Sequence, residues 1–139
     1  MPTLKDPMLE LQRAIVSALK ADATLMGLVS GVYDRVPQDQ AKPYVQVGFS
    51  TEAPWNAYGS KGYDLTTTIY IWHEAGYNAP ALAVKAELDR ILDDADPAIT
   101  VDGFQVVRLW REFADTTPRD NDTVTRSVPV RYRAWLQRA

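Results

Sequence analysis

Residues 65–73 read Leu-Thr-Thr-Thr-Ile-Tyr-Ile-Trp-His, and this stretch decides the fold class. It is rich in β-branched and aromatic residues, a composition typical of a β-strand. Alternation along a strand gives it two faces, which carry Leu65, Thr67, Ile69 and Ile71 and, opposite them, Thr66, Thr68, Tyr70 and Trp72. Because both faces are fairly apolar, we predict that this strand is central in its sheet or has one face against a partner.

Two strands are predicted before this stretch. Residues 32–36 form a short extended segment that Pro37 ends. Residues 44–50 alternate with the period of a half-buried strand, and the apolar side chains of its inward face are Val45, Val47 and Phe49.

Strands are also predicted in the C-terminal third, over residues 104–113 and 124–136, separated by a polar loop. Asp102-Gly103 is a hairpin turn signal, so we expect residues 99–101 to pair with the segment that begins at Phe104. Pro129 has no N–H to donate to a neighbouring strand, which indicates a sheet edge or a β-bulge at that position.

Apolar residues at helical spacing predict two main helices and a short one. Residues 7–21 carry a stripe formed by Met8, Leu11, Ile15 and Leu19. Asp22 can cap a second, shorter helix that Gly31 closes. A third helix follows Asn78 and stops near Asp93, with a stripe formed by Val84, Leu88, Ile91 and Leu92.

The chain has 139 residues, which fits one domain, and its 46% apolar content supplies a core. We therefore predict a single α+β domain, residues 1–139. Its architecture should be a mainly antiparallel sheet of four to six strands with two main helices packed on one face.

Composition excludes several functions. The formal net charge is −3, which argues against a dedicated nucleic-acid binder, because such proteins cluster Lys and Arg. The chain has no cysteine, so disulfides, thiolate nucleophiles and cysteine-bound zinc are excluded. We find no signal peptide and no apolar run near the roughly 20 residues that span a membrane.

The sequence offers little for catalysis. His73 is the only histidine. It could be a base or a metal ligand, but both roles need matched partners, so we favour an exposed or interface residue at a strand end. Asp93, Asp94 and Asp96 lack the spacing of a calcium loop, and no phosphate-binding or dinucleotide motif is present. We predict no catalytic residue, no metal site and no cofactor.

Aromatic residues and arginines are the candidates for contact with partners. Residues 51–64 are expected to form a long loop that carries Trp55, Tyr58 and Tyr63. In the last strand, Arg131, Arg133 and Trp135 share a face. Three interpretations of that face stay open, namely a nucleic-acid surface, an exposed face neutralised by acids such as Glu112, and a subunit interface.

Three stretches resemble one family. They are residues 32–37 (Val-Tyr-Asp-Arg-Val-Pro) with residues 43–48 (Pro-Tyr-Val-Gln-Val-Gly), residues 68–73 with the helix after them, and residues 128–135. With the N-terminal helix, they resemble the tail terminator or tail-completion proteins of long-tailed, non-contractile phages and gene transfer particles. The resemblance covers nearly the whole chain in element order.

The resemblance implies a homo-oligomer, a hexameric ring in the neck of a virion that is assembled in the bacterial cytoplasm. The ring would cap the tail tube after the last ring of the major tail tube protein, stop tube polymerisation and offer a surface to the head-tail connector or stopper protein. It implies no catalysis and no membrane, and DNA would pass through the lumen without specific binding.

A ring of identical subunits needs two different contact surfaces on each chain. The candidates are the strand face with Tyr70, Trp72, Arg131 and Arg133 and the aromatic loop around Trp55. Three alternatives remain: another neck protein such as a head-tail stopper or adaptor, a small ligand-binding module with the long loop as a lid, and a hydrolase or nuclease.

Overall fold

The computed structural model describes residues 4–56, 61–74, 78–116 and 125–139. They form a five-stranded sheet and three helices, which confirms the predicted α+β class. The elements in chain order are α1 (Pro7–Lys20), α2 (Ala23–Met26), β1 (Val32–Tyr33), β2 (Tyr44–Pro54), β3 (Gly62–Glu74), α3 (Ala79–Leu92), β4 (Phe104–Ala114) and β5 (Thr125–Arg138).

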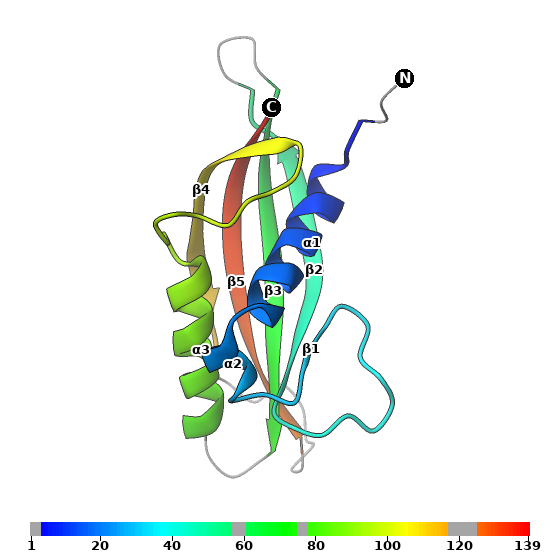
Figure 1. Ribbon diagram of the computed structural model, residues 1–139, viewed down its shortest axis with the longest axis vertical. Coiled ribbons are helices and arrows are strands. Elements are labelled where there is room, and N and C mark those ends of the chain that lie inside the picture. The colour runs from blue at the N-terminus through cyan, green and yellow to red at the C-terminus, as the bar shows by residue number, and fades with distance from the viewer. Residues whose placement is uncertain (1–3, 57–60, 75–77, 117–124) are drawn as a thin grey trace.

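The strands lie in the order β1-β2-β3-β5-β4, so the predicted central strand is central. Only β1 and β2 are parallel, and the other three pairings are antiparallel. Helices α1 and α3 lie side by side on one face of the sheet (Figure 1). None of the described helices lies on the opposite face, which we call the outer sheet face.

Side-chain caps fix where the first two helices begin. Asp6 accepts a hydrogen bond from the Leu9 N–H at 3.0 Å, and Asp22 accepts one from the Leu25 N–H at 3.0 Å. Helix α2 ends at Met26, so the expectation that it continues to Gly31 is wrong. The chain turns there because Gly27 caps the helix and the segment after it must pair as β1.

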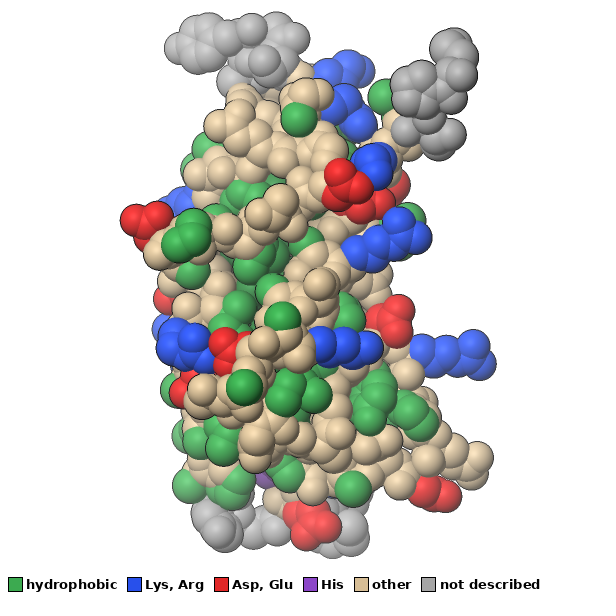
Figure 2. All heavy atoms as spheres, viewed as in Figure 1, with side chains coloured by type: hydrophobic (Ala, Val, Ile, Leu, Met, Phe, Trp, Pro, Cys, Tyr) green, Lys and Arg blue, Asp and Glu red, His purple; other side chains and the backbone are tan. Residues whose placement is uncertain are grey.

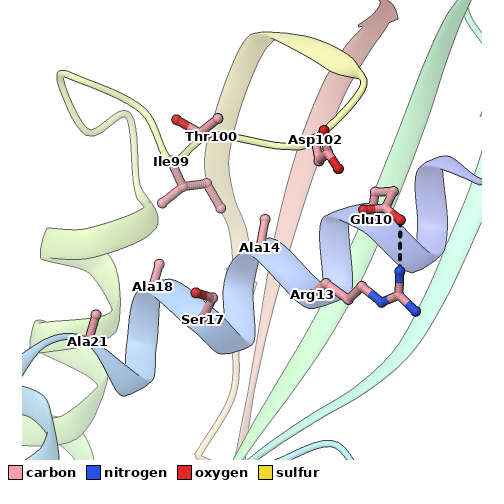
Figure 3. Close-up of a pocket in the computed structure, with 9 residues that line it drawn as sticks. All are labelled: Glu10, Arg13, Ala14, Ser17, Ala18, Ala21, Ile99, Thr100 and Asp102. Carbon is pink, nitrogen blue, oxygen red and sulfur yellow. Dashed lines mark hydrogen bonds and ion pairs between the residues drawn. The ribbon is translucent and has the colours of Figure 1, made fainter. Parts of the chain in front are cut away.

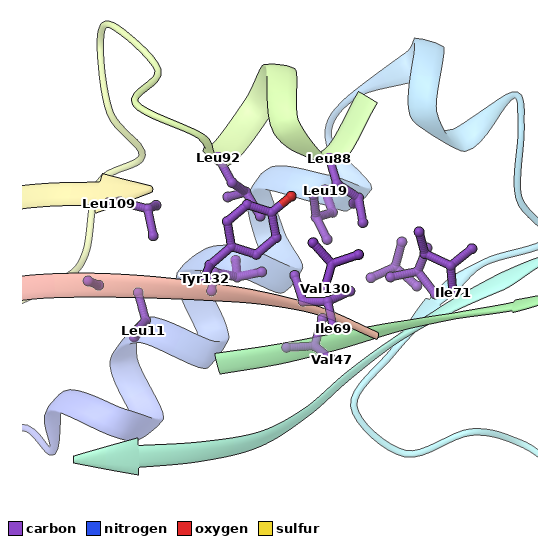
Figure 4. Packing of buried hydrophobic residues seen from close by; sticks show 14 of the residues in the cluster. Leu11, Leu19, Val47, Ile69, Ile71, Leu88, Leu92, Leu109, Val130 and Tyr132 are labelled. Carbon is purple, nitrogen blue, oxygen red and sulfur yellow. The ribbon is translucent and has the colours of Figure 1, made fainter. Parts of the chain in front are cut away.

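The core lies between the sheet and the two main helices (Figure 4). Most residues of the helix stripes and of the inward strand faces are buried, including Leu11, Leu19, Val47, Ile69, Ile71, Leu88, Leu92 and Val130, whereas Met8 and Ile91 are partly buried. Burying each such side chain contributes roughly 1.5–3 kcal/mol. Tyr132 is the largest of these buried side chains, and its hydroxyl donates to Asp89 at 2.7 Å. The helices are therefore fixed to one face, and the outer sheet face is left for other contacts.

The long loop expected at residues 51–64 is mostly a β-hairpin. Strand β2 runs to Pro54 and β3 starts at Gly62, with Ala53 opposite Asp64. The outer half of β2 has exposed residues because it lies at an edge of the sheet. The sequence there lacks the alternation of apolar and polar residues that predicts a strand. Pro54 is tolerated because the neighbouring Trp55 donates its N–H to the Gly62 carbonyl, so alternation points the nitrogen of Pro54 away from β3.

Phe49 was expected on the buried face with Val45 and Val47, and this expectation is wrong. A β-bulge between Val47 and Ser50 shifts the alternation by one residue. Phe49 is therefore 77% exposed.

Two expectations for the C-terminal strands are wrong. Residues 99–101 form no strand; Val101 is buried in the core, and its carbonyl accepts the Phe104 N–H across a turn in which Gly103 has a φ of 83°. Pro129 lies in an interior strand with an unbroken register to β3, not at an edge or a bulge. It is accepted because β4 stops opposite Val130, one residue before an N–H from Pro129 would be required, while the Pro129 carbonyl accepts the Asp115 N–H at 3.1 Å.

Candidate functional site: the outer sheet face

The outer sheet face brings together most of the predicted contact residues. Alternation along β3 and β5 places five of them there: Tyr70, Trp72, Arg131, Arg133 and Trp135. Trp55 joins them by stacking on Trp135. Tyr58 lies outside the described residues.

One end of this face carries an aromatic group that we call the Trp72 cluster, formed by Tyr44, Phe49, Tyr70 and Trp72. Trp72 stacks on Tyr44 with ring centroids 6.3 Å apart, and the Tyr70 ring centroid also lies 6.3 Å from that of Trp72. Phe49 meets Tyr70 edge to face at 6.0 Å. The indole N–H of Trp72 donates to Gln46 at 3.0 Å, so the ring is held in one orientation.

The other end carries the Trp135 cluster, formed by Trp55, Trp110 and Trp135. Trp55 stacks on Trp135 at 5.0 Å with an interplanar angle of 14°, and Trp110 meets Trp135 edge to face at 4.9 Å. The guanidinium of Arg108 lies 4.2 Å from the centre of the Trp110 ring. Such contacts stabilise by roughly 0.5–1.5 kcal/mol each beyond area burial.

A row of ion pairs separates the two clusters. Arg133 binds Asp64 through Nη1 at 2.8 and 2.9 Å and Glu112 through Nε at 2.6 Å. Arg131 also binds Glu112 through Nε, at 2.7 Å. The bonds from Arg133 and Arg131 lower the pKa of Glu112, and the same carboxylates raise the pKa of Arg133.

These pairs neutralise the arginines that the sequence placed on this face. The nucleic-acid interpretation needs a field of free cations, and Arg131 and Arg133 do not supply one because both bind acids of the same chain. The outer sheet face therefore consists of half-buried aromatic rings with paired charges between them. Protein–protein interfaces are enriched in the same residue types, Trp, Tyr and Arg.

Tyr63 is the predicted contact residue that lies elsewhere. It points to the helix side of the sheet and meets Phe104 edge to face at 5.9 Å. Arg138 lies over both rings, and it donates to the Tyr63 hydroxyl at 2.8 Å. Tyr63 therefore closes the core at the end of the sheet.

His73 is 4% exposed, so the expectation of an exposed or interface residue at a strand end is wrong. Odd-numbered positions of β3 face the helices, which places its ring inside, with Nδ1 2.9 Å from the Glu74 carbonyl. No group of three or more His, Cys, Asp or Glu side chains that could hold a metal ion occurs within the described ranges. Asp93 and Asp94 are occupied in fixing β4, as acceptors for the Arg111 N–H and for Arg108.

Hollows also lie on the helix-covered side of the sheet. One, of about 410 Å³, lies between α1 and residues 99–102, and Ala14, Ser17 and Ala18 of α1 are part of its lining (Figure 3). Its ion pair joins Arg13 and Glu10 at 3.0 Å. Charged side chains of both signs are scattered among apolar ones on this side (Figure 2). None of the described helices is long and apolar enough to cross a membrane.

Sequence reasoning missed four members of the outer sheet face, namely Tyr44, Phe49, Asp64 and Trp110. Trp110 could have been found, because Arg108 and Trp110 alternate on a predicted strand like Arg133 and Trp135. Asp64 could not have been found, because residues 51–64 looked like a loop. In the structure Asp64 belongs to β3 and lies opposite Trp135 of β5.

Comparison with known proteins agrees with this fold over almost the whole chain. Residues 13–137 match the family described as tail completion protein gp17. The chain is similar to a solved protein of the virion of a native gene transfer agent particle, with a TM-score of 0.80 and 29% identity over 91% of this chain and 94% of that one.

A second solved structure, the gp17 protein of bacteriophage SPP1, shares the fold with a TM-score of 0.64. The identity is 21%, and the match covers 96% of this chain and 95% of that one. No curated protein matches.

These findings define the class as a structural protein of a phage tail or tail-like particle. The chain belongs to the tail completion protein gp17 family, which confirms the resemblance that its sequence shows.

Proposed function

We propose that this protein forms a ring that caps the tail tube, stops tube polymerisation and joins the tail to the head connector. The observation that carries the proposal is the family match over residues 13–137. The similar protein from a gene transfer agent virion supports a place within an assembled particle. The partners would be other copies of the chain, the major tail tube protein and a connector or stopper protein of the neck.

The outer sheet face supports a role in contact. Its tryptophans are half-buried and held by stacking or hydrogen bonds, so they are already ordered before a partner arrives. An ordered aromatic surface loses little side-chain entropy on binding. We propose this face, with Trp55, Tyr70, Trp72, Arg131, Arg133 and Trp135, as a contact surface of the assembled neck. This role needs no catalysis and no cofactor.

The net charge of −3 supports the proposed passage of DNA through the ring, because an acidic protein does not retain a phosphate backbone. The ligand-binding alternative loses its main support, since its expected lid is largely the β2–β3 hairpin. Another neck position, such as a head-tail stopper, remains the second candidate, because the family match concerns tail completion and not the order of neck contacts.

Deletion of the gene distinguishes the two positions. Without a terminator, tails should be overlong or unjoined to heads, because nothing stops the tube. Without a stopper, tails should have normal length and heads should lose DNA. Electron microscopy of particles from the deletion, with a wild-type copy restored as the control, measures both outcomes.

A further inference from the structure

Both contact surfaces that the sequence indicated fall on one face, because Trp55 stacks on Trp135 beside Trp110. A ring of identical subunits joins two different surfaces head to tail. If copies meet side by side, the surfaces that join them must lie at the two opposite edges of the sheet. In this sheet those surfaces are the β2 edge and the β4 edge.

Each edge carries one exposed phenylalanine at a β-bulge. At the β2 edge, the bulge between Val47 and Ser50 turns out Phe49, which is 77% exposed. At the β4 edge, the bulge between Arg111 and Phe113 leaves Phe113 40% exposed. Burial of either ring against a partner would remove apolar area from water, which favours association.

The two phenylalanines lie at the same level of the sheet. Register pairs connect Val47, Ile69, Val130 and Ala114 across the four strands. A second row connects Ser50, Thr67, Tyr132 and Arg111. Phe49 lies between these rows on β2 and Phe113 lies between them on β4, about 14 Å apart across three strand spacings.

We infer that the β2 edge of one copy docks against the β4 edge of a second copy, with Phe49 and Phe113 at the contact. The inference rests on the proposed ring. Neighbouring copies in a closed ring are not shifted along the ring axis. If that axis runs along the strands, residues of the β2 edge therefore meet residues of the neighbour's β4 edge that lie at the same level of the sheet. Three successive antiparallel pairings make β2 and β4 run in opposite directions, so the neighbouring strands are antiparallel.

Two side chains of opposite charge, Glu52 and Arg108, lie at matching levels of the two edges. Glu52 on β2 is exposed and forms no ion pair with the described residues. Its row across the sheet ends at Leu109, next to Arg108. Arg108 is 47% exposed and binds Asp94 through Nε and Nη2, so Nη1 is available to a second carboxylate.

The contact joins side chains and does not extend the sheet by hydrogen bonds at this level. The Leu109 carbonyl already accepts the Asp94 N–H at 2.8 Å, and the Arg111 N–H already donates to Asp93 at 2.8 Å. The backbone of β4 is therefore occupied where the neighbouring β2 would reach it.

Cysteine cross-linking in purified particles tests the inference, because the native chain has no cysteine. Particles are made with chains that carry Phe49→Cys, Phe113→Cys or both, and are treated with a short thiol-to-thiol cross-linker. The double variant should give a ladder of covalent multimers on a denaturing gel. Each single variant should stay monomeric, and co-expressed single variants should give dimers only.

Leu82→Cys combined with Phe113→Cys is the matched control, because Leu82 is 41% exposed on α3 and belongs to neither edge strand. Both phenylalanines are exposed, so thermal unfolding of the variants should match the wild type. Particles that contain the double variant but give no ladder overturn the inference and leave the proposed function intact. Cross-linking by Phe49→Cys alone, or a ladder in the control, also overturns it. Absence of the wild-type protein from particles overturns the proposed function and the inference with it.

Discussion

Tyr132 is the buried residue whose polar atom matters most to the fold. Its ring lies within the core, and its hydroxyl donates to Asp89, which also binds Lys85 at 3.0 Å and Arg111 at 3.1 Å. Burial, together with the bond to Asp89, raises the pKa of this hydroxyl, so it stays protonated and keeps donating. This group joins β5, α3 and β4 at one point.

Tyr132→Phe should lower the free energy of unfolding by about 1–3 kcal/mol, because the hydroxyl bonds a carboxylate. Urea unfolding at neutral pH measures the change. Tyr33→Phe is the control, since Tyr33 is only partly buried and its ring contact with Tyr44 needs no hydroxyl. Equal stability of Tyr132→Phe and the wild type would contradict this account of the network.

Glu112 makes the outer sheet face sensitive to acid. Its bonds to Arg133 and Arg131 hold its pKa below the ordinary range. A depressed carboxyl pKa stabilises the fold above the unfolded-state pKa, and this contribution is lost as the pH falls through the folded-state pKa. The affected window therefore lies below about pH 4.3.

Glu112→Gln should reduce stability at pH 7 and flatten the loss of stability between neutral and acidic pH. Denaturant midpoints measured over this range give both quantities. Glu52→Gln is the matched control, since Glu52 has no ion pair with the described residues, and its curve should follow the wild type. A Glu112→Gln curve parallel to the wild type would show that the ion pairs do not act on folding.

At the scale of elements, the β2–β3 hairpin depends on one glycine. A Cβ added at Gly62 would lie 1.9 Å from the Trp55 carbonyl oxygen, a backbone atom that cannot move away alone. Trp55, whose carbonyl would clash with this Cβ, also stacks on Trp135 through its side chain. The hairpin and the Trp135 cluster are therefore coupled.

Gly62→Ala should lower the unfolding temperature by several degrees, because the clash exceeds the roughly 0.5–1 kcal/mol that such a change gains in a strand. Gly48→Ala is the matched control on the adjacent strand, where a Cβ would meet only the Tyr70 ring at 3.4 Å and the Thr68 carbonyl at 3.6 Å. Differential scanning calorimetry compares the two. A Gly62→Ala protein as stable as Gly48→Ala would refute the steric argument.

Elements with a clear period could be predicted, and elements fixed by distant contacts could not. Residues 65–73 showed their role as the central strand because alternation and β-propensity agree there. The outward half of β2 did not, since Thr51 and Glu52 belong to an exposed edge whose only signal is pairing with β3. Phe49 followed the pattern of Val45 and Val47 until a bulge, which leaves no mark in composition, reversed it.

The same limit applied to the contact surface. Alternation put Tyr70 and Trp72 on one face and Arg131, Arg133 and Trp135 on another strand's face, and β3–β5 pairing confirmed that these faces are shared. Tyr63 was misplaced because a residue in an assumed loop has no face. His73 was misplaced because its position in β3, and not its polarity, decides that it is buried.

At the scale of the whole molecule, the helices cover one face of the sheet and leave the outer sheet face uncovered (Figure 1). Trp72→Ala and Arg133→Ala should fold with the wild-type circular dichroism spectrum but reduce the incorporation of the protein into tails at least about tenfold, the scale of an interface anchor. Leu82→Ala, an exposed change on α3, is the control. Full incorporation of both variants would remove the outer sheet face from the contact surfaces.

The length of tails made without this protein tests whether the protein stops tube polymerisation. We expect a broad distribution that extends well beyond the wild-type length, together with tails that do not join heads, and a return to one length when the gene is restored. Tails of normal length that remain joined to heads in its absence would contradict it.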